Sequence, residues 1–483
     1  MKVKFRFAKL LVWGSIALLG LAIMGCPILA GSVSDQLSQG KTEEPSGQKP
    51  EVEKPENEGN ENGETGEREP GEEGGETGER EPGEEGGETG EREPGEEDSK
   101  IMKEGHGLLV WKIKYPVEKT WEAVLTVFIR IDDKTFIPWK YFDLTVPGAA
   151  ERTASLPAGT YKIEYRFMSH GKNVGSTETV HISPGLKTTS NYTGIDANAL
   201  PDAAEFSSVD ELEAYLNGRP ENTAADPYPV KLTGVDISSK AAKGDTMRTL
   251  YEALEKSERF VSLDLRGGIG TELIPASTAP VLAGRKKIVS IILPETVTVV
   301  ASNGFSGYDE LRSVVLPKVV TINQVAFKNL GNIETVSAPV LITIVDDTST
   351  GSSRGNFYGC IRLTSIYFPK LETIGHHAFY GCDALTEVLL PKVAEVGNSI
   401  FAECTALKTV VLPVADLIGN RAFYNDKALE NLVLGTVPPN VEGSANFSTG
   451  YPEKIYAPVS AVDAYKRSEF WSKMKDSIYP IGA

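Results

Sequence analysis

The stretch Leu363-Thr-Ser-Ile-Tyr-Phe-Pro-Lys370 has two close copies downstream, Leu385-Thr-Glu-Val-Leu-Leu-Pro-Lys392 and Leu407-Lys-Thr-Val-Val-Leu-Pro-Val414. Two residue columns extend this pattern along the chain. They are Pro294, Pro317, Pro339, Pro369, Pro391 and Pro413, and Phe305, Phe327, Phe357, Phe379, Phe401 and Phe423. Both columns keep a step near 22 residues, and both lengthen to 30 at the same place. A fixed period of this size predicts a solenoid in which each repeat forms one coil.

The interior of each repeat reads Leu-x-x-Ile-x-Leu or a close variant, which is typical of leucine-rich repeats. Where the step lengthens, the polar residues Val345–Arg354 are expected to form a surface loop. Cys360, Cys382 and Cys404 recur with the same period, and stacked coils would place them about 5 Å apart. We interpret them as a column of small buried side chains. A disulfide between neighbouring coils and a metal site are the less favoured alternatives.

Length and charge indicate several domains and one acidic segment. At 483 residues the chain is too long for one ordinary domain. Its formal net charge is −18, but residues 51–100 alone hold 21 acidic and 5 basic residues, so the rest of the chain is close to neutral. The sequence shows no basic patch and no RNA-type aromatic motif. Nucleic acid is therefore not an expected partner.

Residues 1–25 have the pattern of a lipoprotein signal peptide. A basic start without acidic residues is followed by an apolar run from Leu11. Ile23-Met-Gly-Cys26 resembles a bacterial lipobox, although Met24 departs from the small or aliphatic residue usual there. We predict cleavage before Cys26 and attachment of a lipid to this residue. The lipid would bind the chain to the membrane. The alternative is an uncleaved anchor helix, because the apolar run continues to Ala30 and nearly reaches membrane-spanning length.

Residues 26–100 are expected to form a disordered acidic tether. Near-identical copies of Gly-Glu-Thr-Gly-Glu-Arg-Glu-Pro-Gly-Glu-Glu-Gly begin at Gly63, Gly75 and Gly87. The segment has no aromatic residues, and its like charges repel one another, so it has nothing with which to build a core. It would hold the following domains away from the lipid surface.

Residues 101–198 change to a two-residue period. Tyr161, Ile163, Tyr165 and Phe167 alternate with charged residues, which indicates a strand with one buried face. Strands are predicted at Leu108–Tyr115, Trp121–Ile131, Tyr141–Val146, Arg152–Leu156, Thr160–Phe167 and Thr177–Ile182. Together they predict an all-β sandwich. The turn from Leu156 to Tyr161 resembles those of immunoglobulin-like or transthyretin-like modules, and the expected role is that of a spacer.

Both ends of the solenoid are expected to carry caps that cover its terminal coils. Residues 199–284 would form the N-terminal helical cap and a degenerate first repeat. There, Ser208-Val-Asp-Glu211 is a capping box that opens a helix, and a second helix begins at Asp245. Residues 285–458 are the repeats. Residues 459–483 would form a C-terminal cap helix that begins at Ser460 and carries Val462, Tyr465, Trp471 and Met474.

The stretch Ile366-Tyr-Phe-Pro-Lys-Leu-Glu-Thr-Ile-Gly-His-His-Ala-Phe-Tyr-Gly-Cys382 resembles the BspA-like (Treponema-type) leucine-rich repeat family. The closing Ile455–Tyr465 segment, with Trp471 and Ile478-Tyr-Pro480, is similar to the C-terminal end of that family. The resemblance covers roughly residues 260–483. It implies a bacterial surface protein used for adhesion to host matrix proteins, to host cells or to other bacteria. It identifies no binding residue, because the motif residues are structural.

Tyr367 and its equivalents are the candidate binding residues. If Leu363, Ile366 and Phe368 point into the coil, Tyr367 points outward. The equivalent slots hold Ile292, Val315, Ser337, Tyr367, Leu389, Val411 and Val433, and Lys318, Lys370 and Lys392 border them. An apolar stripe with basic borders is typical of a protein-binding surface. The alternative is that β-branched residues occupy these slots because they suit a strand.

No catalytic, cofactor or metal site is predicted, and an enzyme is not expected. The sequence has no nucleophile elbow, P-loop or HExxH motif, and His376 and His377 are interpreted as exposed turn residues. The preferred function is that of a lipid-anchored cell-envelope protein, exposed on the outer membrane, that binds a protein ligand through the repeat face in adhesion. The alternatives are a structural envelope protein without a host ligand and a carbohydrate-binding accessory protein.

Overall fold

The computed structural model describes residues 90–92, 102–131, 135–145, 151–192, 197–237, 246–273, 283–346, 355–443, 446–447 and 450–481. The predicted signal peptide, Cys26 and nearly all of the predicted tether lie outside the described residues, as do residues 347–354 of the predicted loop. Residues Pro82–Ala483 form one compact unit. No helix among the described residues has both the length and the apolar character needed to cross a membrane.

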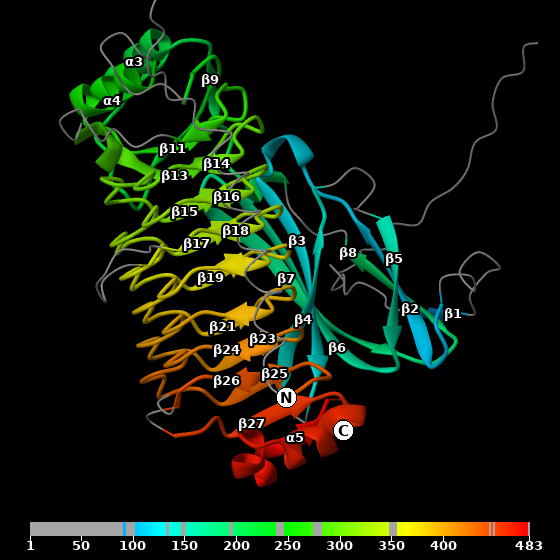
Figure 1. Ribbon diagram of the computed structural model, residues 1–483. Helices are drawn as coiled ribbons and strands as arrows, with labels where there is room; N and C mark the ends of the chain where they lie inside the picture. The colour runs from blue at the N-terminus through cyan, green and yellow to red at the C-terminus, as the bar shows by residue number, and fades with distance from the viewer. Residues whose placement is uncertain are drawn as a thin grey trace, which may run out of the picture. The chain divides into compact units, whose positions relative to one another are not determined.

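The first part of this unit is a pair of four-stranded sheets, with strand orders β1-β8-β2-β5 and β4-β3-β6-β7 (Figure 1). The strands are β1 (Gly90–Arg92), β2 (His106–Ile113), β3 (Glu122–Arg130), β4 (Phe136–Asp143), β5 (Glu151–Pro157), β6 (Gly159–Ser169), β7 (Lys172–Ile182) and β8 (Lys187–Tyr192). Two 3-10 helices, η1 (Val117–Lys119) and η2 (Ala197–Ala199), accompany them. Strands β2 to β7 overlap predicted strands. Strand β1 lies in the segment predicted as tether and pairs antiparallel with β8.

The facing sides of the two sheets share one apolar core. Tyr161, Ile163, Tyr165 and Phe167 of β6 are all buried in it, which confirms the predicted alternation. The Tyr161 hydroxyl donates to the Pro157 carbonyl at 2.7 Å and ties β6 to the turn before it. The two sheets therefore pack as a sandwich. The likeness to immunoglobulin-like or transthyretin-like modules stays a prediction.

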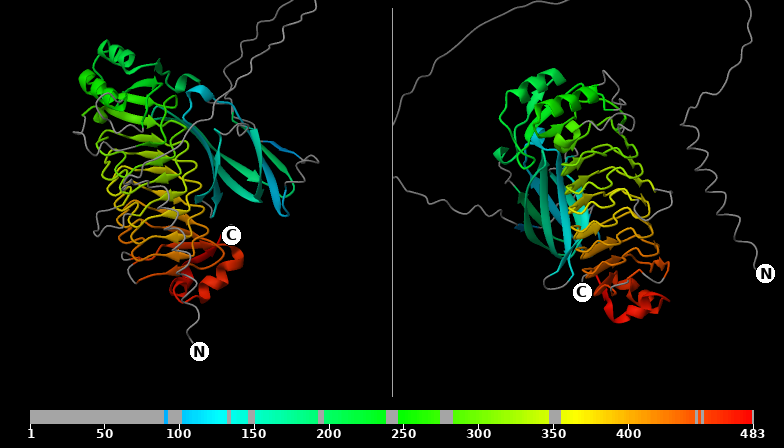
Figure 2. Two further views of the ribbon diagram at one scale, coloured as in Figure 1. Left: turned by 45° about the horizontal axis from the view of Figure 1, so that its top comes forward. Right: turned by 90° about the vertical axis from the view of Figure 1, so that its left-hand side faces the viewer.

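The second part is a solenoid with two short parallel strands in most coils (Figures 1 and 2). The longer column consists of β9 (Ala204–Phe206), β10 (Tyr228–Leu232), β11 (Val261–Asp264), β13 (Ile288–Ile292), β15 (Ser313–Val315), β17 (Thr335–Ser337), β19 (Ser365–Tyr367), β21 (Glu387–Leu389), β23 (Thr409–Leu412), β25 (Asn431–Leu434), β27 (Lys454–Ala457) and β28 (Ile478–Pro480). The shorter column consists of β12 (Glu272–Leu273), β14 (Val299–Val300), β16 (Thr321–Ile322), β18 (Thr343–Ile344), β20 (Thr373–Ile374), β22 (Glu395–Val396), β24 (Leu417–Ile418) and β26 (Asn440–Val441). The repeat region is thus a β-rich leucine-rich repeat solenoid, as predicted.

Equivalent residues of successive coils lie directly above one another. Phe305 and Phe327 stack at 4.6 Å between ring centroids, Phe327 and Phe357 at 4.8 Å, and Phe357 and Phe379 at 5.1 Å. The stacking continues through Phe401 and Phe423 and ends on Phe447, one coil beyond the predicted column. The column crosses the lengthened repeat without a break. The extra residues are therefore accommodated outside the stacked positions.

The cysteine column is buried and reduced. Cys360, Cys382 and Cys404 are free thiols with no exposed surface. The Cys360 thiol donates to the Phe327 carbonyl at 3.1 Å, and Cys382 and Cys404 make the same contact with the phenylalanine of the preceding coil, at 3.3 and 3.1 Å. Burial raises the pKa of Cys360 to about 12, so the group stays a thiol and keeps the proton that it donates. The buried-column interpretation is confirmed.

The N-terminal cap follows the prediction closely. It contains α3 (Val209–Asn217), α4 (Thr246–Ser257) and the 3-10 helix η3 (Ala283–Lys287). The Ser208 side chain accepts the backbone N–H of Glu211, and Gly218 ends α3. Strands β9, β10 and β11 continue the longer column in parallel, so the cap covers the first coil and extends its sheet.

The C-terminal cap differs from the single predicted helix. It consists of η4 (Val459–Ala461), α5 (Val462–Arg467) and η5 (Trp471–Ser477). The predicted cap at Ser460 is wrong, because Ala461 precedes α5 and offers no capping side chain. Ser468 is extended and ends α5, and its hydroxyl accepts the backbone N–H of Trp471, which starts the next turn. The break lets the Trp471 indole donate to the Pro439 carbonyl at 2.9 Å, which closes the solenoid.

Asp426 occupies the position of the cysteines in the next coil. It is buried, and one carboxylate oxygen accepts the Cys404 backbone N–H at 2.9 Å. The other carboxylate oxygen has no partner among the described residues. Burial raises the pKa of Asp426 from 3.8 to about 9. The folded protein therefore holds a proton that the unfolded chain releases.

We expect the free energy of unfolding of the Asp426→Asn variant to fall less at high pH than that of the wild-type protein. In the wild-type protein this group lowers the free energy of unfolding as pH rises from about 4 to about 9, by at most about 1.4 kcal/mol per pH unit. Urea unfolding at pH 5 and pH 8, followed by circular dichroism, would show a larger drop in wild type than in the variant. An equal drop in both proteins would contradict a raised pKa at Asp426.

Candidate functional site

The predicted binding stripe is buried in this structure. Of the candidate residues, Ile292 is 1% exposed, Val315, Tyr367, Leu389 and Val411 are each 2% exposed, and Val433 is 4% exposed. None of them belongs to the solenoid core, so the outward direction of these side chains is as predicted. Their expected exposure is wrong, because the sheet β4-β3-β6-β7 of the sandwich lies against them.

One end of this interface is an apolar cluster. Leu389, Val411 and Val433 of the stripe pack with Ile131 and Ile137 of the sandwich. Tyr456 of β27, the equivalent residue of the next coil, belongs to the same cluster. Aliphatic side chains at equivalent slots form a flat apolar strip, and strand β4 contacts strands β21 and β23 of this strip.

The other end of the interface is a second cluster. Trp121 and Met168 of the sandwich pack on Ile292 and Val315 of the first repeats. The Ser313 hydroxyl donates to the Met168 sulfur at 3.0 Å. Next to this cluster, Arg266 donates to the Thr120 carbonyl at 3.2 Å. Residues of three coils thus bind the beginning of β3 and the end of β6.

The middle of the interface is polar and aromatic. Tyr141 meets Tyr367 edge to face, with 5.0 Å between ring centroids. Arg166 donates to the Ser365 hydroxyl at 2.8 Å and forms an ion pair with Glu122 at 2.6 Å. Burial alone would lower the pKa of Arg166, but the adjacent Glu122 carboxylate, together with Tyr141 and Glu164, raises it above its ordinary value. Arg166 is therefore a charged side chain that links the two domains.

Several buried polar atoms at this interface lack a partner among the described residues. They are Trp121 Nε1, Glu122 Oε2, His170 Nε2 and Ser337 Oγ. Burial lowers the pKa of His170 to about 4, so this imidazole is neutral. Glu122 and Ser337 border a void of about 10 Å³, which is close to the space that one water molecule needs.

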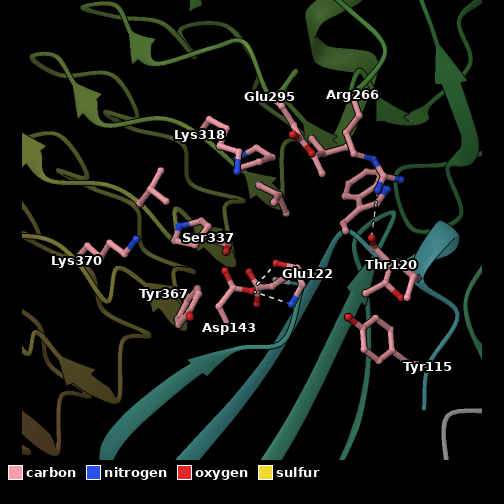
Figure 3. Close-up of a pocket in the computed structure, with 18 residues that line it drawn as sticks. Tyr115, Thr120, Glu122, Asp143, Arg266, Glu295, Lys318, Ser337, Tyr367 and Lys370 are labelled. Carbon is pink, nitrogen blue, oxygen red and sulfur yellow. Dashed lines mark hydrogen bonds between the residues drawn. The ribbon is translucent and has the colours of Figure 1, made fainter. Parts of the chain in front are cut away.

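A cleft of about 620 Å³ opens beside the buried interface (Figure 3). Its solenoid wall contains Lys318, Ser337, Tyr367 and Lys370, and Asp143 lies across from them on the sandwich (Figure 3). Lys370 is exposed, as predicted for a residue that borders the stripe. Lys392, another predicted border residue, is also exposed but pairs with Glu372 at 3.2 Å and does not line the cleft.

The absence of metal and catalytic sites stays a prediction, and the described residues bear on metal binding alone. No group of three or more His, Cys, Asp and Glu side chains could hold a metal ion in this part of the chain. His376 is exposed, and its ring accepts the backbone N–H of Asn398 at 2.8 Å, so it serves a turn. His377 has a positive φ of 57° in the same turn.

The sequence of strand β3 indicates that its outer face is covered. The predicted two-residue alternation considers only one buried face and misses this. The strand reads Glu-Ala-Val-Leu-Thr-Val-Phe-Ile-Arg, so apolar residues occupy both of its faces. A strand with only one buried face alternates, whereas a near-continuous apolar run indicates burial on both faces. Val124 and Phe128, which alternate with the core residues, are 1% and 3% exposed. This run predicts a second layer over the sandwich, and the solenoid supplies it.

We expect Leu389→Glu together with Val411→Glu to separate the sandwich from the solenoid. Burying two unpaired carboxylates in the apolar cluster would cost on the order of several kcal/mol. Opening the interface avoids this cost. Small-angle scattering would show a larger radius of gyration, while the far-ultraviolet circular dichroism stays unchanged. Lys392→Glu, an exposed change outside the cluster, serves as the control. An unchanged radius in the double variant would contradict the interface.

A match to a known protein family agrees with the fold of the solenoid. Residues 281–353 and 350–456 match the family described as BspA type leucine rich repeat region, in 6 copies. Among solved structures, a leucine rich repeat protein of T. pallidum is 21% identical over 44% of this chain and 80% of its own, with a TM-score of 0.24. An internalin from Listeria monocytogenes is 13% identical over 57% of this chain and 74% of its own, with a TM-score of 0.32.

A leucine rich cell surface protein from Faecalibacterium prausnitzii is 16% identical over 55% of this chain and 79% of its own, with a TM-score of 0.23. TM-scores this low carry no argument about function. No curated protein matches the chain. The matched family is a structural repeat, and no catalytic family is indicated. The repeat region of this chain, residues 281–456, belongs to the BspA-type leucine-rich repeat family.

Proposed function

We propose that this chain is a protein-binding protein of a bacterial cell surface that acts in adhesion to host matrix, to host cells or to other bacteria. The observation that carries the proposal is the composition of the strand face. Its apolar slots, Tyr367 and the neighbouring Ser365 already hold a folded β-sheet, through two apolar clusters and one arginine. An apolar patch with aromatic and arginine contacts is typical of protein–protein interfaces. A solenoid presents such a face preformed, so little ordering entropy is lost on binding.

The same observation divides the proposal into two modes of binding. In the docked form the stripe is covered, and an external partner would contact the exposed rim that includes Lys370. In an opened form the sandwich would leave, and the whole stripe from Ile292 to Val433 would bind the partner in its place. The proposed binding face is the one predicted from the sequence, but its accessibility depends on the sandwich.

The carbohydrate-binding alternative receives no support from the tryptophans. Stacking on sugars needs an open aromatic face, whereas Trp111 is fully buried in the sandwich core and Trp121 is 4% exposed. The third sandwich tryptophan, Trp139, is half-buried, and Lys140 Nζ lies 4.8 Å from the centre of its ring. Trp121 also packs against the His170 ring at 4.5 Å. A protein partner therefore remains the better proposal.

Variants on either side of the interface separate the two modes. Ile131→Glu with Ile137→Glu changes the sandwich side and should undock it while the stripe stays intact. Leu389→Glu with Val411→Glu also undocks the sandwich but spoils the stripe. Immobilised full chain would be exposed in turn to purified host matrix proteins and bacterial surface proteins, and binding would be measured by surface plasmon resonance.

If the stripe is the binding face, the sandwich-side variant binds about tenfold or more tightly than the stripe-side variant, which corresponds to about 1.4 kcal/mol. If the rim is the binding face, the two variants bind alike. Failure of the wild-type chain and of both variants to bind any of these proteins would contradict the proposal and favour a structural envelope protein.

We further propose that a lipid on Cys26 anchors the chain, with exposure on the outer membrane. The support is the Ile23-Met-Gly-Cys26 motif and the acidic segment that follows it. Cells grown with labelled palmitate should yield labelled wild-type protein in the membrane fraction, whereas Cys26→Ser should lose both the label and the membrane association. Unlabelled protein that stays in the membrane fraction would favour an uncleaved anchor helix.

A further inference from the structure

We propose that the cleft between the solenoid and the sandwich binds an extended acidic segment of a protein partner, with Lys318 and Lys370 holding two of its carboxylates. This inference deepens the proposed function and rests on it, because it names a partner chemistry and a site for the docked form. The cleft holds about 620 Å³, within the range of about 300–1,000 Å³ that is common for ligand sites. It lies beside the covered stripe, between residues of the solenoid and residues of the sandwich (Figure 3).

Lys318 and Lys370 are the cations of the cleft that form no ion pair with a described residue. Both are exposed, and both occupy the slot after the repeat proline, while Val340 occupies that slot in the coil between them. Arg266, the third cation of the cleft, already pairs with Asp264 at 2.6 Å and donates to the Thr120 carbonyl. Within the described part of the cleft, the two lysines are therefore the cations available to an anionic ligand.

The spacing of the two lysines fits an extended peptide. Neighbouring coils are about 4.8 Å apart, so two coils separate the lysine backbones by roughly 10 Å. Carboxylates at alternate positions of an extended chain lie about 6.7 Å apart on one face. Flexible lysine side chains cover the difference of a few ångströms. A segment with acidic residues at alternate positions therefore reaches both ammonium groups.

The acidic groups of the cleft decide how such a segment would lie. Glu122 is paired with Arg166, and Asp143 accepts the Thr145 backbone N–H at 2.9 Å through one of its oxygens. The second oxygen of Asp143 accepts no hydrogen bond from a described residue. It lies on the sandwich wall, opposite the lysines (Figure 3). Glu295 lines the same cleft and repels anions near Lys318. Glu295 occupies the after-proline slot one coil before Lys318, so ligand carboxylates belong between Lys318 and Lys370, on the side away from Glu295, and peptide N–H groups face Asp143.

The remaining surface of the cleft suits apolar side chains between the acids. The half-buried Pro317, Pro339 and Val340 line it together with the two lysines, whereas Ile292 and Val315 at its edge are already covered by the sandwich. An extended segment that alternates acidic and aliphatic residues would place its carboxylates on the lysines and its aliphatic side chains on this surface. A polysaccharide acid would satisfy the lysines but leave the apolar residues uncovered. The combination of charges and apolar surface points to a peptide.

The test uses the acetylated, amidated and fluorescently labelled peptide Glu-Val-Glu-Val-Glu and the full chain. Binding is measured by fluorescence anisotropy in about 50 mM salt, a low ionic strength that leaves charge pairs largely unscreened. We expect Lys318→Gln with Lys370→Gln to weaken binding about tenfold or more. Lys392→Gln is the matched control, since it occupies the same slot of the next coil outside the cleft. The Gln-Val-Gln-Val-Gln peptide should bind at least about tenfold more weakly to wild type.

Equal affinity of wild type and the double lysine variant would overturn the proposal, as would preferential binding of a uronic acid oligosaccharide of equal charge. Peptide binding that arises only after deletion of residues 31–100 would also overturn the proposal. The chain's own acidic segment, and not an external partner, would then be the occupant of the cleft. Both lysines are exposed, so the variant should keep its unfolding temperature. If wild-type chain captures a protein partner that the double lysine variant binds equally well, the cleft assignment fails while the proposed function stands.

Discussion

The vertical alignment of coils is the constraint on which the rest of this structure depends. Parallel strands pair residue for residue from coil to coil, as in Thr335 with Ser365 and Val336 with Ile366. Each position of the repeat therefore becomes a column of like side chains. The phenylalanine column stacks its rings, and the cysteine column donates its thiol protons to the phenylalanine carbonyls of the preceding coil. A residue that differs from its column, such as Asp426, consequently places a polar group in the core, with its pKa raised by burial and one oxygen without a partner among the described residues.

The same alignment explains why the strand face accepts a sheet. Equivalent slots on successive coils carry Leu389, Val411 and Val433, and these make one apolar strip that the sheet covers. On the sandwich, Ile131 and Ile137 project from the matching side. Each domain thus has a layer that is incomplete alone, because sheets bury an apolar face against another element. Residues that suit a strand by propensity also serve as the contact surface, so the two explanations of the stripe are compatible.

The repeat region could be predicted nearly in full from the sequence, and the domain interface could not. Period and column position determine which residues enter the coil, so the inward Ile366 and Phe368 and the outward Tyr367 were assigned correctly. Contacts such as Arg166 with Ser365 join residues that are far apart in the chain, and no local period encodes them. The apolar run of β3 indicated that something covers the sandwich but not which element. The break of the C-terminal helix at Ser468 was likewise missed, because a serine is compatible with either a helix or its end.

The chemistry of the interface suggests how firmly the two domains are held. Apolar clusters lie at both ends, whereas the middle contains an ion pair and polar atoms without partners among the described residues. An unsatisfied buried polar group costs about 1–3 kcal/mol, so atoms such as Ser337 Oγ and Glu122 Oε2 offset part of the gain from apolar burial. The docked arrangement is therefore less stable than its buried area alone implies. A ligand in the adjacent cleft contacts both domains at once, and it would stabilise the docked form by its preference for that form over the open one. Ligand binding at Lys318 and Lys370 would then also keep the stripe covered by the sandwich.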